Sequence, residues 1–393
     1  MFASNRTAAL ADLLTAVDRL APVARAHADE SERLRTLAPA VVDALRGSGL
    51  AQLAVPESLG GGEADPSTQL AVFEAMAHAD TSAGWCLMIA AMTNALAGAY
   101  LADPGAAEVF RAPPLCAGLQ TPSGTARHVD GGYILDGRWG FGSGIRHASW
   151  IVTSAIVVGD DGAPPAGPPP LRSVVVPVSE ATIEDTWDVV GLRGSGSDHY
   201  RLDGVFVPEA RTWVFPDGAP RRGGAMYRLP MIALLTAAHV GFALGAARRA
   251  LDELAVVARL RTKAWTRVRL GDHAGFQLEL GRTEARLSAA RAWAVEVCAM
   301  LTAKAEELGE RDWIAVRGAT TYVTEIAAEV ATFAYRASGG GAVYTSIPVQ
   351  RPFRDLLAAV QHIAATDDAY EFIGRCRLGL STPHPLLQPR RPA

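Results

Sequence analysis

The spacing of apolar residues changes twice along the chain and divides it into three parts. In residues 1–114 apolar side chains recur every three or four positions, which is typical of amphipathic helices. In residues 115–228 the period falls to two and β-branched residues become frequent, which indicates strands. In residues 229–393 the helical period returns. We therefore expect an N-terminal helical domain, a middle β domain and a C-terminal helical domain with these bounds.

Turn residues locate the strands of the middle part. An Asp130-Gly131-Gly132 turn joins two runs of alternating hydrophobicity and predicts a hairpin. Two further runs, Ser149–Val158 and Arg172–Val178, are rich in β-branched residues and predict strands. A proline-rich stretch between them is typical of a surface loop.

The third part contains four long stretches of helical period, which is typical of a helix bundle. They are Leu229–Thr262, Gly275–Leu308, Asp312–Ser338 and Val349–Leu378. The segments Ala83–Ala102 and Pro230–Ala247 are nearly long and apolar enough to span a membrane, but neither has a basic flank with an aromatic belt. Since helices that are apolar all round occur in the cores of large proteins, we expect no membrane partner.

Composition and charge narrow the class of protein. The chain has 393 residues, of which 49% are hydrophobic and 20% charged, so it can bury sizeable cores. Its formal net charge of −4 argues against a nucleic-acid partner, which requires a cationic surface. The four cysteines are widely spaced without a CxxC pair, and the N-terminal segment lacks the apolar run of a secretory signal. We expect a cytoplasmic protein.

Common catalytic motifs are absent from the sequence. No GxGxxG follows a predicted strand, so we expect no site for a nicotinamide dinucleotide, and neither GxxxxGK[ST] nor GxSxG occurs. The histidines form no HxH or HExxH pattern, so we expect no metal site. Isolated histidines such as His239 are expected to be ordinary surface or core residues.

Four segments, in this order, resemble the acyl-CoA dehydrogenase superfamily. They are LAVPESLGGGEAD, DGRWGFGSGIRHASWIV, VVGLRGSGSDHYRLDGVFVPEA and SGGGAVYTSIPVQRPFRDLLAAVQH. The resemblance covers nearly the whole chain. It implies an α+β fold with an N-terminal helical domain, a middle β-barrel and a C-terminal four-helix bundle. It also implies a flavin between the barrel and the bundle, and a homotetramer built as a dimer of dimers. The apolar C-terminal helices, which are unsuited to face water on all sides, point to the same assembly.

Two chemistries within this superfamily require different residues. The dehydrogenases abstract a proton from an acyl thioester with a glutamate. The matching position here holds Ile363 or Ala364, and Glu371 lies too far along the chain to replace it. The acid–base geometry of a dehydrogenase is therefore not visible, although some members take the base from another helix.

The chain is more similar to the flavin-dependent monooxygenases of the two-component type. These carry a W-x-F-x-S-G-x-x-H-A-x-W segment, which here runs from Trp139 to Trp150. They also carry a histidine after an Arg-Asp pair on the last long helix. Here Arg354-Asp355 is followed by His362, and we expect Asp355 and His362 to lie on one helix face. Such enzymes take reduced flavin from a separate reductase and form a C4a-(hydro)peroxide with O2.

The resemblance implies two catalytic residues. Ser143 matches the hydroxyl held at flavin N5, which restrains the loss of H2O2, and His362 matches the imidazole that stabilises the peroxide at C4a. The implied flavin-binding residues are Trp139, Phe141, Ser143, Gly144, Arg267, Gly339, Gly340 and Gly341, with Arg267 serving a neighbouring subunit. Arg269 replaces the glutamine of the dehydrogenases, which leaves FMN and FAD open, and a direct role for His147 also stays open.

These residues have ordinary structural explanations too. Ser143 is compatible with a turn, His362 with a helix surface, and Trp139 with the barrel core. The leading hypothesis is a flavin-dependent monooxygenase that hydroxylates or N-oxygenates a small organic molecule with reduced FMN or FAD. The alternatives are an acyl-CoA dehydrogenase-type flavin oxidoreductase and a non-catalytic binding or assembly subunit with a flavin fold.

Overall fold

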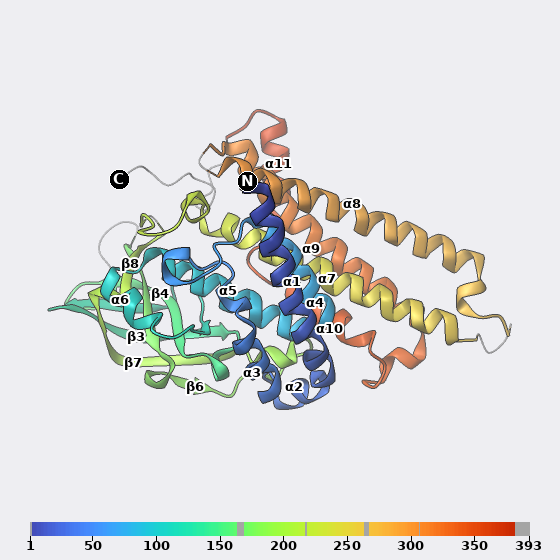
Figure 1. Ribbon diagram of the computed structural model, residues 1–393, viewed down its shortest axis with the longest axis horizontal. Coiled ribbons are helices and arrows are strands. Elements are labelled where there is room, and N and C mark those ends of the chain that lie inside the picture. The colour runs from blue at the N-terminus through green and yellow to red at the C-terminus, as the bar shows by residue number, and fades with distance from the viewer. Residues whose placement is uncertain (1, 163–168, 217, 263–266, 306, 382–393) are drawn as a thin grey trace.

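The structure is a computed structural model that describes residues 2–162, 169–216, 218–262, 267–305 and 307–381. Figure 1 shows a β-sheet at one end of the molecule and three long helices that extend away from it, with the N-terminal helices between them. The changes of element type fall between residues 109 and 116 and between residues 215 and 231. The domain bounds at 114 and 228 stay predictions.

Six helices form the N-terminal part. They are α1 (Phe2–Ala26), α2 (Ala28–Leu34), α3 (Pro39–Ser48), α4 (Pro66–Ala79), α5 (Thr81–Tyr100) and α6 (Asp103–Val109). An aspartate precedes the first residue of both α4 and α5. The carboxylate of Asp65 accepts a hydrogen bond from Thr68 N, and that of Asp80 accepts one from Ala83 N. Both are N-caps, and Asp80 also separates α4 from α5 because its backbone is extended.

In the described part of the chain, eight strands form one mixed sheet. They are β1 (Cys116–Ala117), β2 (Gly124–Val129), β3 (Gly132–Gly142), β4 (Trp150–Val158), β5 (Leu171–Pro177), β6 (Thr182–Glu184), β7 (Asp198–Pro208) and β8 (Thr212–Phe215). The predicted hairpin is confirmed, since Val129 pairs with Gly132 around the Asp130-Gly131 turn. The strands predicted at 149–158 and 172–178 are β4 and β5. The proline-rich loop between them falls partly outside the described residues.

The prediction of a closed β-barrel is wrong. The strand order is β6-β7-β3-β2-β4-β5-β8, with β1 paired to β4, so the sheet is open and ends in β6 and β8. A barrel requires the last strand to pair with the first at a fixed stagger. These end strands have only three and four residues, and among the described residues they pair only with β7 and β5. Alternation of apolar and polar residues along a strand predicts which residues lie on each face of the sheet. It does not predict whether the sheet closes into a barrel.

The C-terminal part differs from the predicted four-helix bundle in its last helix. Three long helices are confirmed as α7 (Met231–Leu260), α8 (Ala274–Lys304) and α9 (Glu310–Ser338). The fourth is broken into α10 (Gln350–Ala359) and α11 (Asp368–Arg377). The buried Arg317 of α9 stabilises the break, because its guanidinium donates to Ala364 O, Thr366 Oγ1 and Asp368 Oδ1, each at 2.8 Å. The carbonyl of Ala364, which a continuous helix would pair internally, therefore has another donor.

The two helical parts share a large hydrophobic core, and the C-terminal helices add a smaller cluster around Trp313. The large core includes Phe73 of α4, Leu87 of α5, Phe242 of α7 and Val323 of α9. Helices α5 and α7 are long and apolar enough to cross a membrane. However, 94% of the apolar stretch of α5 and 83% of that of α7 are buried inside the protein. This confirms that they are core helices. It also removes the argument that α7 needs a second subunit to cover its apolar run.

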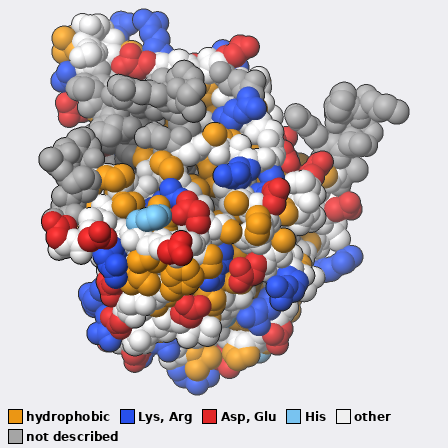
Figure 2. All heavy atoms as spheres, turned by 90° about the vertical axis from the view of Figure 1, so that its left-hand side faces the viewer, with side chains coloured by type: hydrophobic (Ala, Val, Ile, Leu, Met, Phe, Trp, Pro, Cys, Tyr) orange, Lys and Arg blue, Asp and Glu red, His pale blue; other side chains and the backbone are white. Residues whose placement is uncertain are grey.

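Acidic and basic side chains are interspersed with hydrophobic ones on the face that carries the sheet (Figure 2). Such a mixture gives this face no strong field of one sign.

Candidate functional site

Trp85, on α5, connects the two predicted catalytic residues, which lie far apart in the sequence. Its indole Nε1 donates to Ser143 Oγ at 3.0 Å. The centre of its ring lies 5.6 Å from that of His362, in an edge-on arrangement. Ser143 lies in the loop between β3 and β4, and His362 in the loop between α10 and α11. The structure therefore brings Ser143 and His362 together where the sheet meets the helices.

Ser143 is the first member of a chain of buried hydroxyls. Its Oγ lies 2.7 Å from Ser197 Oγ, which lies 2.7 Å from Ser195 Oγ. Since Trp85 Nε1 can only donate, one lone pair of Ser143 is already used. If Ser197 donates to Ser143 as well, the Ser143 proton is free to point out of the chain. The sequence motif contained Ser195 and Ser197 but gave them no role.

His362 does not occupy the helix face that the sequence predicts. Helix α10 ends at Ala359, and His362 follows in the turn, so it does not share a face with Asp355. The backbone N–H of Ala364 donates to His362 Nδ1 at 3.2 Å. Nδ1 is thus the acceptor, and the neutral ring carries its proton on Nε2. Burial lowers the pKa of His362 to about 4, so the ring is neutral at physiological pH.

His239, on α7, is the residue that sequence reasoning missed. Its ring stacks on that of His362 with centres 4.9 Å apart, and it lies edge-on to Trp85 at 6.1 Å. The residue is 1% exposed, and neither ring nitrogen has a hydrogen-bond partner among the described residues. Burial, with a smaller effect of His362, lowers the pKa of His239 well below its ordinary value. Two unpaired buried polar groups cost about 1–3 kcal/mol each. The available signal was a histidine within an otherwise apolar helical run.

The Arg354-Asp355 pair anchors α10 and makes no described contact with the predicted catalytic residues Ser143 and His362. Asp355 is buried and accepts hydrogen bonds from Thr81 Oγ1 at the start of α5 and from Leu192 N at 2.5 Å. Arg354 donates to Val190 O at 2.9 Å and to Glu32 of α2 at 2.7 Å. The pair therefore ties three parts of the chain to the helix that precedes the His362 loop.

The predicted flavin-binding residues near Ser143 have different environments. Trp139 is fully buried in the sheet core, where it stacks on Tyr200 at 5.7 Å and donates to Ser154 O at 2.9 Å. Phe141, near the end of β3, has a positive φ of 57°, unusual for its type, and its ring is 61% exposed to solvent. Gly144 has a φ of 77°, and a Cβ there would lie 3.0 Å from His147 Nε2. Phe141 and Gly144 border Ser143 in the chain, whereas Trp139 offers no free surface.

Arg267 and Gly339–Gly341 both lie near the C-terminal end of α7 and not near Ser143: Arg269, two residues after Arg267, pairs with Thr262, and Gly339 lies against Arg261. Helix α7 ends at Leu260, at the end of the bundle furthest from the sheet (Figure 1). Arg261 there donates to Ser338 O at 2.5 Å, and its guanidinium occupies the space that a Cβ on Gly339 would need. From His239 to Leu260 the helix rises about 30 Å at 1.5 Å per residue. Within one chain, these predicted flavin-binding residues are therefore remote from the catalytic pair.

The position of a dehydrogenase base holds no carboxylate. Ile363 is 55% exposed and Ala364 is buried, and both follow His362 in the same turn. Glu371 lies on α11, where it pairs with Arg375. His147, whose role the sequence left open, packs against Gly144, and burial lowers its pKa to about 4. Within the described residues, no cluster of His, Cys, Asp or Glu could hold a metal ion.

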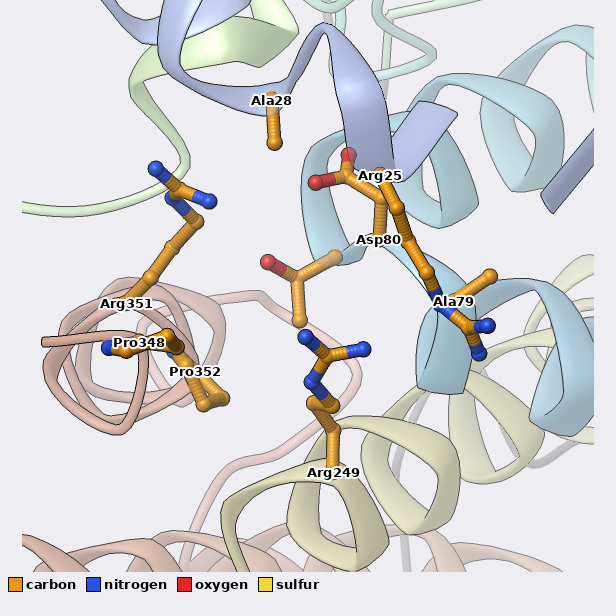
Figure 3. Close-up of a pocket in the computed structure, with 9 residues that line it drawn as sticks. Arg25, Ala28, Ala79, Asp80, Arg249, Pro348, Arg351 and Pro352 are labelled. Carbon is orange, nitrogen blue, oxygen red and sulfur yellow. The ribbon is translucent and has the colours of Figure 1, made fainter. Parts of the chain in front are cut away.

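A small cavity of about 40 Å³ lies apart from these residues, between α1, α5, α7 and α10 (Figure 3). Arg25, Asp80, Arg249 and Arg351 line it. Their charges are largely paired: Arg351 bonds to Asp29, Arg249 bonds to Glu253 at 2.6 Å, and Asp80 caps α5. Like the Arg354-Asp355 pair, this network joins α10 to the N-terminal helices.

Comparison with known proteins places this geometry in a family. The model of the acyl-CoA dehydrogenase N-terminal domain matches residues 14–112, and that of the C-terminal domain matches residues 237–367. The chain is 32% identical to an indole-3-acetate monooxygenase from Pseudomonas putida, over 90% of each chain. It is 29% identical to the oxygenase component of an FADH2-dependent resorcinol hydroxylase from Rhizobium sp., covering 93% of this chain and 94% of that one.

The fold agrees with these matches. A structure of XiaF from Streptomyces sp., in complex with FADH2 and glycerol, superposes with a TM-score of 0.90 at 29% identity, covering 98% of this chain and 99% of that one. The chain belongs to the acyl-CoA dehydrogenase superfamily, in its branch of flavin-dependent monooxygenase oxygenase components, and it is an enzyme of that class. The non-catalytic alternative is thereby set aside.

Proposed function

We propose that the chain is an oxygenase component that receives reduced FMN or FAD from a separate reductase and uses O2 to hydroxylate or N-oxygenate a small organic molecule, through a flavin C4a-hydroperoxide. The observation that carries this proposal is the convergence of Ser143 and His362 on Trp85, from the sheet and from the helices. The relatives that act on indole-3-acetate and resorcinol favour an aromatic substrate.

The residues at this junction fit a flavin. A flavin ring needs hydrogen-bonding groups along one edge and flat apolar surfaces for its faces. Ser143 supplies a buried hydroxyl, and His362 supplies an Nε2–H donor. Exposed Phe141 supplies a ring, held edge-on to Trp187 at 6.3 Å. Bound there in reduced form, the flavin would supply the two electrons that activate O2.

Each residue then has a defined task. Ser143 would hold its hydroxyl at flavin N5, where it would restrain loss of the N5 proton. His362 would donate a hydrogen bond from its Nε2–H to the oxygen that develops charge, and as a neutral donor it would need no proton from solvent. Trp85 holds both in place and, with the surrounding apolar side chains, keeps water out.

A second copy of the chain completes the proposal. Since Arg267 and Gly339–Gly341 are remote from Ser143 in one chain, we propose that they bind the flavin of a neighbouring subunit in a homotetramer, a dimer of dimers. The apolar surface beside them supports this: Leu260 is 78% exposed, and Val343 and Tyr344 are each 70% exposed. Exposed apolar surface of this kind is typical of subunit interfaces.

The test is anaerobic mixing of the purified chain with reduced FMN or FAD, followed by rapid mixing with O2. Transient formation of a C4a-adduct, seen by absorbance, is expected, and oxidation of free flavin without an intermediate would contradict the proposal. Oxidation of a panel of acyl-CoA thioesters with a dye acceptor should give no turnover. Because the sequence lacks a strand–GxGxxG–helix unit, the chain alone should not oxidise NADH.

A further inference from the structure

The strongest anomaly in the molecule is a polar residue that the proposed reaction does not use. His239 is 1% exposed, and both of its ring nitrogens are without hydrogen-bond partners among the described residues. Buried polar groups are nearly always paired, and a neutral imidazole has one donor and one acceptor to satisfy. A histidine required only for packing could be replaced by an aromatic residue that leaves nothing unpaired.

The neighbours of His239 define where its missing partner would lie. Its ring stacks on His362 at 4.9 Å and meets the edge of Trp85 at 6.1 Å. Phe242, one turn further along α7, packs edge-on to the same indole at 5.0 Å. His239 thus belongs to the cluster that contains the catalytic pair, and it enters that cluster from a different element, α7.

The chemistry of this cluster restricts what His239 can bind. The rings that contact it are those of Trp85 and His362, and Trp85 in turn contacts Phe242 and donates to the Ser143 hydroxyl. Desolvation keeps the imidazole neutral, so it cannot balance the charge of a carboxylate. It can accept one hydrogen bond from a neutral donor, and aromatic walls suit a donor that is attached to a flat ring. The ring hydroxyl of a phenol and the ring N–H of an indole both meet these conditions.

The two histidines would then have separate tasks. Nδ1 of His362 is already used by Ala364 N–H, which leaves its Nε2–H as a donor. His239 has no such bond and can accept. We propose that His239 is a specificity-determining residue that accepts a hydrogen bond from the ring hydroxyl or ring N–H of an aromatic substrate and so orients that ring against the reacting centre. This inference rests on the proposed function and deepens it.

The test compares aromatic ligands that differ only in the proposed donor. The full-length chain, reconstituted with oxidised FMN or FAD so that no turnover occurs, is titrated calorimetrically with two pairs of probes. These are resorcinol against 1,3-dimethoxybenzene, and indole against 1-methylindole. We expect the wild-type chain to bind the donor-bearing member of at least one pair about tenfold more tightly, as a buried hydrogen bond permits.

Variants separate specificity from packing. His239→Phe should reduce that preference to about onefold, because only the binding of the donor-bearing ligand is weakened. The melting temperature of this variant should not fall, because two unpaired polar groups are removed. His239→Gln, which keeps an acceptor, should retain a preference of several-fold. His128→Phe, which changes an exposed histidine of β2, is the matched control and should leave the preference unchanged.

Three results would overturn the inference: a wild-type chain that binds neither pair, a wild-type chain without preference, or a preference that survives in His239→Phe. None of these measurements depends on oxygen chemistry. A chain that shows the preference but forms no C4a-adduct would overturn the proposed function and leave the binding role of His239 supported.

Discussion

At the scale of the residue, the site consists of neutral polar groups in apolar surroundings. Ser143 is 6% exposed and His239 is 1% exposed, and the pKa values of His362 and His239 are both lowered by burial. In such surroundings a hydrogen bond is electrostatically stronger than in water, and the direction of each donor matters. Exchange of one group should therefore change reactivity more than it changes folding.

The first prediction concerns the catalytic pair. Ser143→Ala should hasten decay of the C4a-adduct to H2O2, and His362→Ala should slow its formation, each on the order of a hundredfold. Ser143→Ala should also cost about 1–3 kcal/mol of stability, because Trp85 Nε1 loses its acceptor. Stopped-flow absorbance and the H2O2 released per reduced flavin measure these effects. Ser58→Ala is the control, since it removes an exposed hydroxyl that lies outside the serine chain. Wild-type traces in both variants would falsify the assignment.

The second prediction concerns the protonation of His362. With a pKa of about 4 and Nδ1 occupied by Ala364 N–H, its ring should stay a neutral Nε2–H tautomer from pH 5.5 to 8. Nitrogen-15 NMR of the imidazole would show titration near pH 6.5 if this is wrong. The lowered pKa also has a consequence for stability. The unfolded chain binds a proton at His362 below about pH 6.5 and the folded chain does not, so this residue destabilises the fold as the pH falls from 6.5 towards 4.

At the scale of the element, the short helix α10 depends on polar anchors because its neighbours come from distant parts of the chain. Asp355 joins it to α5 and to the loop before β7, while Arg317 of α9 holds the turn that follows it. These bonds set the position of His362. Arg317 lies on the buried face of α9, between Trp313 and Thr320. A charged residue at such a position in the sequence indicates that its side chain has a buried hydrogen-bond partner.

The third prediction uses the buried carboxylate of Asp355. Burial raises its pKa to about 6 from an ordinary value of 3.8, so the folded chain holds a proton that the unfolded chain has released between these pH values. Stability due to this group therefore falls as the pH rises from about 4 to 6, by about 3 kcal/mol. Asp355→Asn should remove that loss. Relative to the wild type, the variant should become more stable as the pH is raised from 4 to 7, as measured by denaturant unfolding.

Leu357→Gln tests whether any change in this region has the same effect. It alters an exposed residue of the same helix and adds no ionisable group. The difference in unfolding free energy between this variant and the wild type should therefore be constant with pH. If Asp355→Asn shows an equally constant difference, the carboxylate is ionised throughout and the argument fails.

At the scale of the whole molecule, the single chain covers its own apolar helices but leaves an apolar end. Helix α7 is buried along most of its length, whereas Leu260, Val343 and Tyr344 at the far end of the bundle are exposed. The reason to expect assembly is therefore this surface rather than the apolar run of α7.

The fourth prediction is that the chain forms a tetramer through this end. Light scattering at micromolar concentration should give the mass of four chains. Leu260→Asp should shift the mass to dimers or monomers, because a charge would be buried at the interface, and should weaken flavin binding in parallel. Val214→Asp, on the exposed side of β8, should leave the mass unchanged. A wild-type monomer would contradict the prediction.

The order of elements, the hairpin, three of the long helices and the family could all be predicted from the amino-acid sequence. Local spacing fixes which residues become buried on a helix or strand, and the Trp139–Trp150 segment and His362 match residues that the family places at its reaction centre. Neither signal needs knowledge of distant contacts.

Only the tertiary structure decided the open sheet, the break after Ala359 and the cluster around Trp85. Closure of a sheet depends on its end strands, and the break depends on Arg317, which comes from another helix. His239 had an ordinary apolar context in the sequence. Its unpaired nitrogens become visible only when α7, α5 and the α10–α11 loop pack together, because hydrogen-bond satisfaction is a property of neighbours in space and not of neighbours in the chain.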